Sequence, residues 1–313
     1  MNKGKKISLA LAAGTAATVA GAFVGYKIAF QSDPERQAAI EDIPEGEMFD
    51  KLKDEMLTNI NRLLVVPYER ISVRSHDGLT LVGKYYEGQP GAPLIIFFHG
   101  YRSTGERDAS GGFQLCRERG WNLLVVDQRS HGESGGRTIT FGIRERYDCR
   151  TWAEYAARRF GPETPIFIWG ISMGASTVLM ASNLELPASV RGIVADCGFD
   201  TPGGIMKSTL RRWRWPQFPM YQFAALGARL FGGFRLNETS ALECVRTAHL
   251  PILLVHGEED GIVPCEMAHA LRAACASPVT LLTVPGASHG ISWYVDLPAY
   301  QEALVRFMEE NLK

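Results

Sequence analysis

The chain has 313 residues, of which 46% are apolar and 21% charged, a composition typical of a folded protein with one large domain or two small ones. Its net charge of −1 and pI of about 6.7 exclude the strongly basic character expected of a nucleic-acid-binding chain. The cysteines form no C-x-x-C pair, so a zinc or thioredoxin-like site is not indicated.

The N-terminal segment, residues 1–30, has the pattern of a membrane anchor or a signal peptide. The lysines within Lys3–Lys6 precede an uncharged run, Ile7–Tyr26, that is long enough to cross a bilayer as a helix. Ala20–Ala22 would suit signal-peptide cleavage. The apolar run continues past that point, which favours an uncleaved anchor with the remaining chain outside the cytoplasm. The prediction is therefore a single-pass protein of the cell membrane, and the alternative is secretion after cleavage.

Residues 31–69 form a polar, acidic connector in this interpretation. Apolar residues recur at helical spacing between Met48 and Ile60, which predicts one surface helix. From Arg70 the pattern changes to a β-hairpin, in which Asp77-Gly78 supplies the turn and Leu79–Tyr86 the returning strand.

The third segment, residues 70–313, alternates short apolar runs with helical patterns and is expected to form one domain. Runs that are apolar on both faces are typical of buried parallel strands, and they are Leu94–Phe98, Leu123–Val126, Ile166–Trp169, Ile193–Ala195, Ile252–Val255 and Val279–Val284. Helices are predicted near Phe113–Arg119, Arg144–Arg159, Ser172–Asn183, Glu266–Cys275 and Pro298–Leu312. This order predicts an α/β fold with a mostly parallel central sheet, helices on both faces, and a site at the carboxyl ends of the strands.

One stretch, about 200–248, interrupts the alternation with helix-like sequence. It is long for a loop, so we expect a small helical cap. The cap combines basic and aromatic residues, among them Lys207, Arg211, Trp213 and Trp215. Such a segment is usually a solvated basic face over a packed apolar one. The alternative is a surface that rests on anionic lipid.

The candidate nucleophile is a serine that follows a predicted strand directly and opens a helix. The segment Gly170–Gly174 matches G-x-S-x-G, the nucleophile elbow, with Ser172 at its centre. A serine hydroxyl needs a base at neutral pH, and the chain order on this fold is serine, acid, histidine. His289, in a turn after the last strand, fits this role better than His256, which ends a strand, or His269, which lies on a predicted helix.

The acid and the oxyanion hole are expected from neighbouring loops. Asp260 lies before a glycine in the loop that follows the next-to-last strand, and Glu258 and Glu259 are its rivals. The acid would fix the imidazole tautomer. Two backbone amides, those of Met173 and Tyr101, are the candidates for the oxyanion hole.

From Arg70 onwards the chain resembles the α/β-hydrolase superfamily, in particular the bacterial serine aminopeptidase-like and lysophospholipase-like hydrolases. The matching segments are His99-Gly100, Asp127–Gly136, Gly170–Gly174, His256–Pro264 and His289. Ser130 stands where that superfamily usually has glycine. The resemblance implies hydrolysis of an ester, thioester, amide or peptide bond with no cofactor and no metal. It implies no catalytic role for Asp127 or His131.

The sequence thus predicts a serine hydrolase, carboxylesterase or lipase-like, that forms an acyl-enzyme on Ser172. Its expected partners are a small-molecule or lipid acyl substrate and the membrane, through the N-terminal segment, with no nucleic acid and an unspecified oligomeric state. Two alternatives stay open. One is a serine peptidase or amidase with the same triad, in which an acidic residue such as Asp200 would hold a substrate amine. The other is a non-catalytic binding protein on the same fold.

Overall fold

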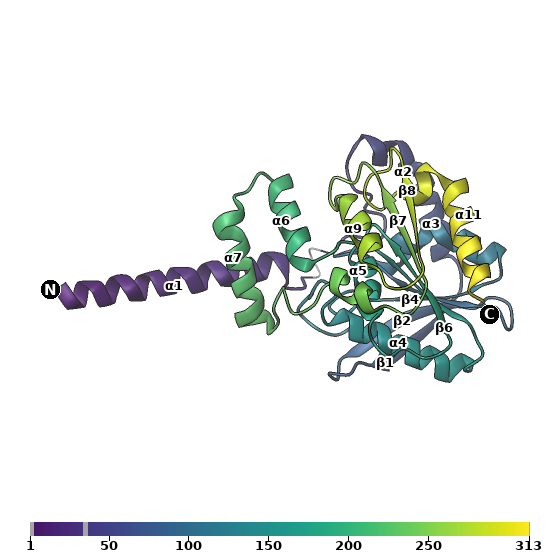
Figure 1. The fold of residues 1–313 in the computed structure, drawn as a ribbon, viewed down its shortest axis with the longest axis horizontal. Coiled ribbons are helices and arrows are strands. Elements are labelled where there is room, and N and C mark those ends of the chain that lie inside the picture. The colour runs from purple at the N-terminus through teal and green to yellow at the C-terminus, as the bar shows by residue number, and fades with distance from the viewer. Residues whose placement is uncertain (1–2, 34–36, 313) are drawn as a thin grey trace.

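The computed structural model describes residues 3–33 and 37–312 and is built around an eight-stranded sheet (Figure 1). The strand order is β1-β2-β4-β3-β5-β6-β7-β8. The first two strands pair antiparallel, β2 also runs antiparallel to β4, and every later pairing is parallel. The strands are β1 Glu69–Arg74, β2 Thr80–Tyr86, β3 Leu94–Phe98, β4 Asn122–Val126, β5 Ile166–Ile171, β6 Val190–Asp196, β7 Ile252–Gly257 and β8 Val279–Val284.

Both faces of the sheet are covered by apolar packing, as the continuous apolar runs predict. Along β3, Ile96 and Phe98 belong to one buried cluster while Ile95 and Phe97 belong to the other. The helices that cover the sheet are α2 Glu47–Leu64, α3 Gly105–Glu118, α4 Glu145–Phe160, α5 Met173–Ala181, α9 Glu266–Ala274 and α11 Leu297–Glu310, with the short helices α8 Ala241–Cys244 and α10 Ser292–Val295 between them. The expected α/β-hydrolase architecture, with its antiparallel hairpin and parallel sheet, is confirmed.

Helix α3 begins earlier than predicted, and the expected start at Phe113 is wrong. Thr104 caps the helix by accepting a hydrogen bond from the amide of Arg107. The glycines of the first turns disfavour a helix in isolation. In the folded chain a Cβ on Gly105 would collide with Val125, and one on Gly112 would collide with Trp169. Close packing against the sheet therefore selects glycine where helix propensity does not.

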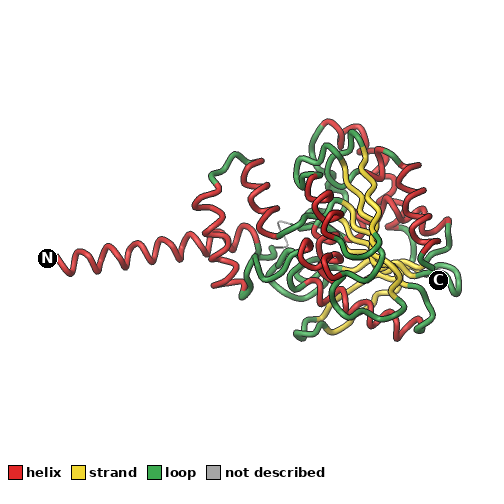
Figure 2. Tube along the Cα trace, in the orientation of Figure 1, coloured by secondary structure: helices red, strands yellow, loops and turns green. Residues whose placement is uncertain are grey.

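The N-terminal helix α1, Lys3–Ala29, and the cap helices project from one side of the sheet-containing body (Figures 1 and 2). The cap consists of α6 Pro202–Arg212, α7 Gln217–Gly227 and the π-helix η2 Ala228–Gly232. Helix α1 packs against α7 near its own C-terminal end. A Cβ on Gly25 would lie 2.9 Å from the backbone nitrogen of Ala224, so glycine permits this close approach.

The end of α1 enters the core of the hydrolase body. Tyr26 and Phe30 belong to the larger buried cluster, and the Phe30 side chain has no exposed surface. The Phe30 ring packs edge-on against Phe141 and Phe234, with centroid distances of 5.8 and 5.2 Å. The division into segments 1–30, 31–69 and 70–313, with a cap at about 200–248, stays a prediction. The packing of Phe30 against Phe141 and Phe234 joins the first of these segments to the third.

We expect Phe30→Ala to lower the free energy of unfolding by about 3–5 kcal/mol, because a buried aromatic ring is removed and a cavity is left. Val24→Ala is the matched control, since Val24 lies on the same helix and is 54% exposed. Denaturant unfolding of the full chain in detergent micelles measures both. Equal midpoints for the two variants would show that the end of α1 contributes nothing to the hydrolase core.

Candidate active site

Ser172 sits at the sharp turn between β5 and α5. Its backbone has φ 55° and ψ −116°, a conformation that is unusual for a residue with a side chain. The turn brings α5 so close to β3 that a Cβ on Gly174 would overlap the carbonyl oxygen of Phe98. The Ser172 amide donates to the carbonyl of Asp196 at 2.8 Å, which ties the turn to β6. The local structure is that of the predicted nucleophile elbow.

The structure brings three of the predicted site residues into one hydrogen-bonded chain. His289 Nε2 lies 2.8 Å from Ser172 Oγ, and His289 Nδ1 lies 2.6 Å from Asp260 Oδ2. With Nδ1–H donating to the carboxylate, Nε2 carries the lone pair that can accept the serine proton. Ser172 and His289 are partly exposed while Asp260 is buried, so a substrate can reach the serine and the acid is shielded from water.

The rival residues lie elsewhere. Glu258 and Glu259 are exposed, and Glu258 accepts a hydrogen bond from the Thr283 hydroxyl at 2.8 Å. His269 is exposed on α9. His256 is buried and its Nε2 lies 2.9 Å from the carbonyl oxygen of Val263, so its ring braces the loop that carries the acid.

Asp260 is held in its ionised form. Its Oδ1 accepts the amides of Ile262 and Val263, each at 2.8 Å. Burial by itself would raise the pKa of Asp260, but the electrostatic interaction with His289 and the hydrogen bonds from both neighbouring histidines outweigh it and hold the pKa well below its usual range. A permanent negative charge beside Nδ1 favours the imidazolium that forms when His289 accepts a proton.

The loop after β3 carries the candidate oxyanion donor and passes close to the serine. A Cβ on Gly100 would lie 3.4 Å from Ser172 Cβ, so the neighbouring Tyr101 amide belongs to the surroundings of Ser172. Asp108 on α3 fixes this loop by accepting the Gly100 amide at 2.7 Å. Met173 is the first residue of α5, where a backbone amide has no acceptor within its own helix.

The segment Asp127–Gly136 braces that loop through two buried histidines. His131 Nε2 accepts the amide of Arg102 at 3.0 Å, and His99 Nε2 accepts the amide of Gln128 at 3.1 Å. Burial lowers the pKa of His131 to about 3, so its ring stays neutral and keeps its lone pair for Arg102. Ser130 has φ 66°, a backbone conformation that glycine adopts more readily than serine.

Sequence reasoning missed a buried pair beneath the triad. Asp196, at the end of β6, accepts a hydrogen bond from the Tyr300 hydroxyl of α11 at 2.8 Å, and both residues are buried. Burial raises the pKa of Asp196 to about 6. The one available signal was the position of Asp196 at the carboxyl end of a predicted strand, because no motif links it to a tyrosine more than a hundred residues away.

Two groups of potential metal ligands occur among the described residues, and the carboxylates of both groups already accept hydrogen bonds. In the first group, Cys197 adjoins Asp260 and His289, which bond to each other. Burial raises the pKa of the Cys197 thiol well above its usual range, which disfavours the thiolate that binds metals. In the second, His76 lies near Asp77 and Asp148, whose carboxylates receive hydrogen bonds from the Arg129 guanidinium.

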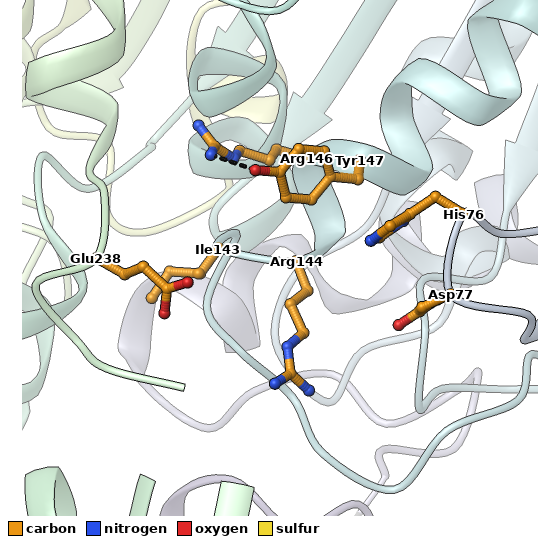
Figure 3. Close-up of a pocket in the computed structure, with 7 residues that line it drawn as sticks. All are labelled: His76, Asp77, Ile143, Arg144, Arg146, Tyr147 and Glu238. Atoms are coloured by element: carbon orange, nitrogen blue, oxygen red, sulfur yellow. Dashed lines mark hydrogen bonds between the residues drawn. The ribbon is translucent and has the colours of Figure 1, made fainter. Parts of the chain in front are cut away.

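A pocket of about 460 Å³ lies between the β1–β2 turn and the start of α4 (Figure 3). His76 and Asp77 lie on one side of it and Glu238 on the opposite side, with Arg144 between them and Arg146 beside Tyr147 (Figure 3). None of the three triad residues lines it. The pocket is therefore separate from the candidate active site.

Comparison with known proteins shows the family to which the chain belongs. The model of the prolyl oligopeptidase family matches residues 109–313. A Bacillus subtilis protein, YqkD, is 28% identical over 62% of this chain and 64% of its own length. The lysophosphatidylserine lipase ABHD12 of Danio rerio is 25% identical over 62% of this chain and 50% of its own length. The chain thus spans less than two thirds of the length of either relative.

Solved structures show the same fold. An esterase of Pyrococcus furiosus superposes with a TM-score of 0.66 at 21% identity, covering 80% of this chain and 93% of the esterase. A puromycin-hydrolysing peptidase of Mycobacterium tuberculosis superposes with a TM-score of 0.61 at 19% identity, covering 80% of this chain and 40% of the peptidase. Since the family match extends over more than half of the sequence, the chain belongs to the prolyl oligopeptidase family and is a serine hydrolase of the α/β-hydrolase fold.

Proposed function

We propose that this protein cleaves a carboxylic ester or thioester through an acyl-enzyme on Ser172. The observation that carries the proposal is the hydrogen-bonded chain from Ser172 through His289 to Asp260, with distances of 2.8 and 2.6 Å. Ester chemistry is supported by two similar proteins, one described as a lysophosphatidylserine lipase and the other as an esterase.

In the proposed reaction the Ser172 hydroxyl adds to the acyl carbonyl carbon while His289 Nε2 takes its proton. The amides of Tyr101 and Met173 donate to the oxygen that becomes negatively charged, and Asp260 stabilises the imidazolium. The tetrahedral intermediate collapses as His289 returns the proton to the departing alcohol or thiol. A water molecule, deprotonated by His289, then releases the acid and restores the serine.

The charge of the cap favours an acyl substrate over a free peptide amine. Residues 201–237 contain arginines and a lysine but neither aspartate nor glutamate. An enzyme that binds a substrate ammonium group needs a nearby carboxylate. Asp200, the candidate for that role, accepts a hydrogen bond from the Thr201 hydroxyl at 3.1 Å. The substrate test below distinguishes a peptidase or amidase function from ester hydrolysis.

We also propose that α1 anchors the protein in the cell membrane with the hydrolase body outside the cytoplasm. The stretch Leu11–Ala29 is long and apolar enough to cross a bilayer, with a mean hydropathy of 1.2. The lysines that precede it favour a cytoplasmic N-terminus. Ala22, where a signal peptide would be cleaved, is fully buried against the cap, which favours retention of the helix.

Ser172→Ala is expected to lower kcat/KM for p-nitrophenyl esters by about 10⁴-fold or more, because nucleophile and base act as a unit. The assay uses the full chain in detergent with acyl chains from acetate to palmitate. Ser182→Ala is the matched control, since the Ser182 hydroxyl bonds to the Leu179 carbonyl outside the site. Hydrolysis of aminoacyl amides but not of esters would favour the peptidase function. Failure of Ser172 to react with a fluorophosphonate probe would contradict both the esterase and the peptidase function.

Asp260→Asn should lower kcat by about 10⁴-fold, since an amide cannot hold the imidazole in the required tautomer. Glu259→Gln, one residue earlier and exposed, should leave kcat within about twofold of the parent, as is usual for surface substitutions away from a site. Steady-state kinetics with a short-chain ester measures both. If the two variants lose activity to a similar extent, Asp260 is not the acid of the triad.

A further inference from the structure

We propose that the cap docks into the headgroup region of an anionic phospholipid bilayer, at the point where α1 enters the membrane. The proposal rests on the anchor proposed above and is independent of the catalytic chemistry. Three observations support it: the length of α1, the exposed apolar side chains on α1 and the neighbouring cap, and the charge of the cap.

The length of α1 places the cap at the bilayer. The hydrocarbon core is about 30 Å thick, and the uncharged run Ile7–Tyr26 would span about 30 Å as a helix. From Gly21 onwards, however, one side of α1 packs against α7. The part before Gly21, Ile7–Ala20, spans only about 21 Å. A bilayer that covers the uncharged run must therefore reach the level at which α7 crosses α1.

The opposite side of α1 at this level is exposed and apolar. Phe23 is 46% and Val24 54% exposed, although they lie beside the cap. The Phe23 ring contacts Phe231 of η2 edge-on, with a centroid distance of 5.1 Å, and Leu230 next to it is 52% exposed. The exposed apolar side chains of the helix thus meet those of η2 at this ring contact. Contiguous exposed apolar surface of this kind marks an interaction site.

A second group of exposed apolar side chains lies at the turn between α6 and α7. Trp213 and Trp215 are 52% and 47% exposed, and their rings make an edge-to-face contact at a centroid distance of 5.5 Å. Phe218, at the start of α7, is 75% exposed. Tryptophan is enriched at membrane–water interfaces because its ring is apolar and its N–H is polar.

The charged residues around these side chains match an anionic lipid surface. Arg211, Arg212 and Arg214 flank the tryptophans and are exposed, as is Arg229 next to η2. A solvated surface ordinarily mixes both signs of charge, whereas residues 201–237 contain no acidic side chain. Aromatic residues among arginines are typical of helices that lie in the headgroup region.

The orientation of the cap helices agrees with this arrangement. Figure 1 shows α7 running across α1, with α6 beside it, rather than along the direction of α1. If α1 stands along the bilayer normal, α6 and α7 lie close to the membrane plane, as interfacial helices do. The sheet-containing body then lies on the far side of the cap from the bilayer centre (Figure 1).

The test measures whether lipid reaches the cap tryptophans in the full chain. The protein is reconstituted into vesicles of phosphatidylglycerol and phosphatidylcholine, with brominated phosphatidylcholine as a quencher of tryptophan fluorescence. Trp213→Phe/Trp215→Phe should lose most of the quenching seen in the parent, because Trp152, Trp169 and Trp293 are buried. Trp121→Phe is the matched control and should keep it, since Trp121 lies at the amino end of β4, away from the cap. Equal quenched fractions in the parent and the double variant overturn the proposal.

The charge requirement is tested separately. Arg211→Glu/Arg212→Glu/Arg214→Glu should reduce the quenched fraction in anionic vesicles by about half or more, since basic residues near an anionic surface each add to the attraction. Unchanged quenching would contradict the proposed role of the arginines. If lipid does not quench the tryptophans and two copies of the protein can be cross-linked through the cap, the cap is a self-association surface and the docking proposal is wrong. The tryptophan fluorescence of Ser172→Ala should be quenched to the same extent as that of the parent. The quenching experiment therefore tests the docking proposal, and the ester assay tests the catalytic proposal separately.

Discussion

The backbone turn at Ser172 is the constraint around which the candidate active site is arranged. A side chain at positive φ of this kind costs about 1–3 kcal/mol and persists only when the surroundings enforce it. Here the neighbouring strands and α5 hold the Ser172 backbone in this conformation. The Ser172 amide is bound by the carbonyl of Asp196 on β6, and its carbonyl accepts the amide of Ser176 one turn along α5. Gly170 and Gly174 allow α5 to approach the ends of β5 and β3. The position of the serine oxygen is therefore set by packing of the central strands before any hydrogen bond to His289 is made.

The order of the strands then decides which residues can meet the serine. Neighbours β5, β6, β7 and β8 lie side by side, so the loops after β7 and β8 bring Asp260 and His289 to the same edge. Strand β6, which lies between β5 and β7, contributes Asp196, a buried residue that Tyr300 joins to the C-terminal helix α11. The last helix is thus part of the support of the site as well as of the sheet covering. A similar support exists on the other side, where Asp108 and His131 hold the loop that carries Tyr101.

Sequence patterns predicted most of this arrangement where the physical signal was local. The central strands were recognisable because they are apolar on both faces, and Ser172 because a glycine-flanked serine joins a strand to a helix. The prediction failed where tertiary packing overrides local preference. The glycines at the start of α3 suggest a loop, yet the contact with Val125 and Trp169 requires them. Nothing in the local pattern marks Phe30 as a core residue, because its burial against Phe141 and Phe234 depends on residues far along the chain. The bond between Asp196 and Tyr300 could not be predicted because neither residue belongs to a motif.

The burial of Tyr26 and Phe30 has a consequence for how such an enzyme would find its substrate. Because Tyr26 and Phe30 are buried in the hydrolase core, the proposed anchor packs directly on the body that carries Ser172. In a bilayer the body could not tumble independently, and Ser172 would be kept at a fixed height above the lipid. Encounters would then occur by lateral diffusion in two dimensions. The rate would follow the mole fraction of substrate in the membrane, and adding inert lipid at constant bulk concentration would slow turnover by surface dilution.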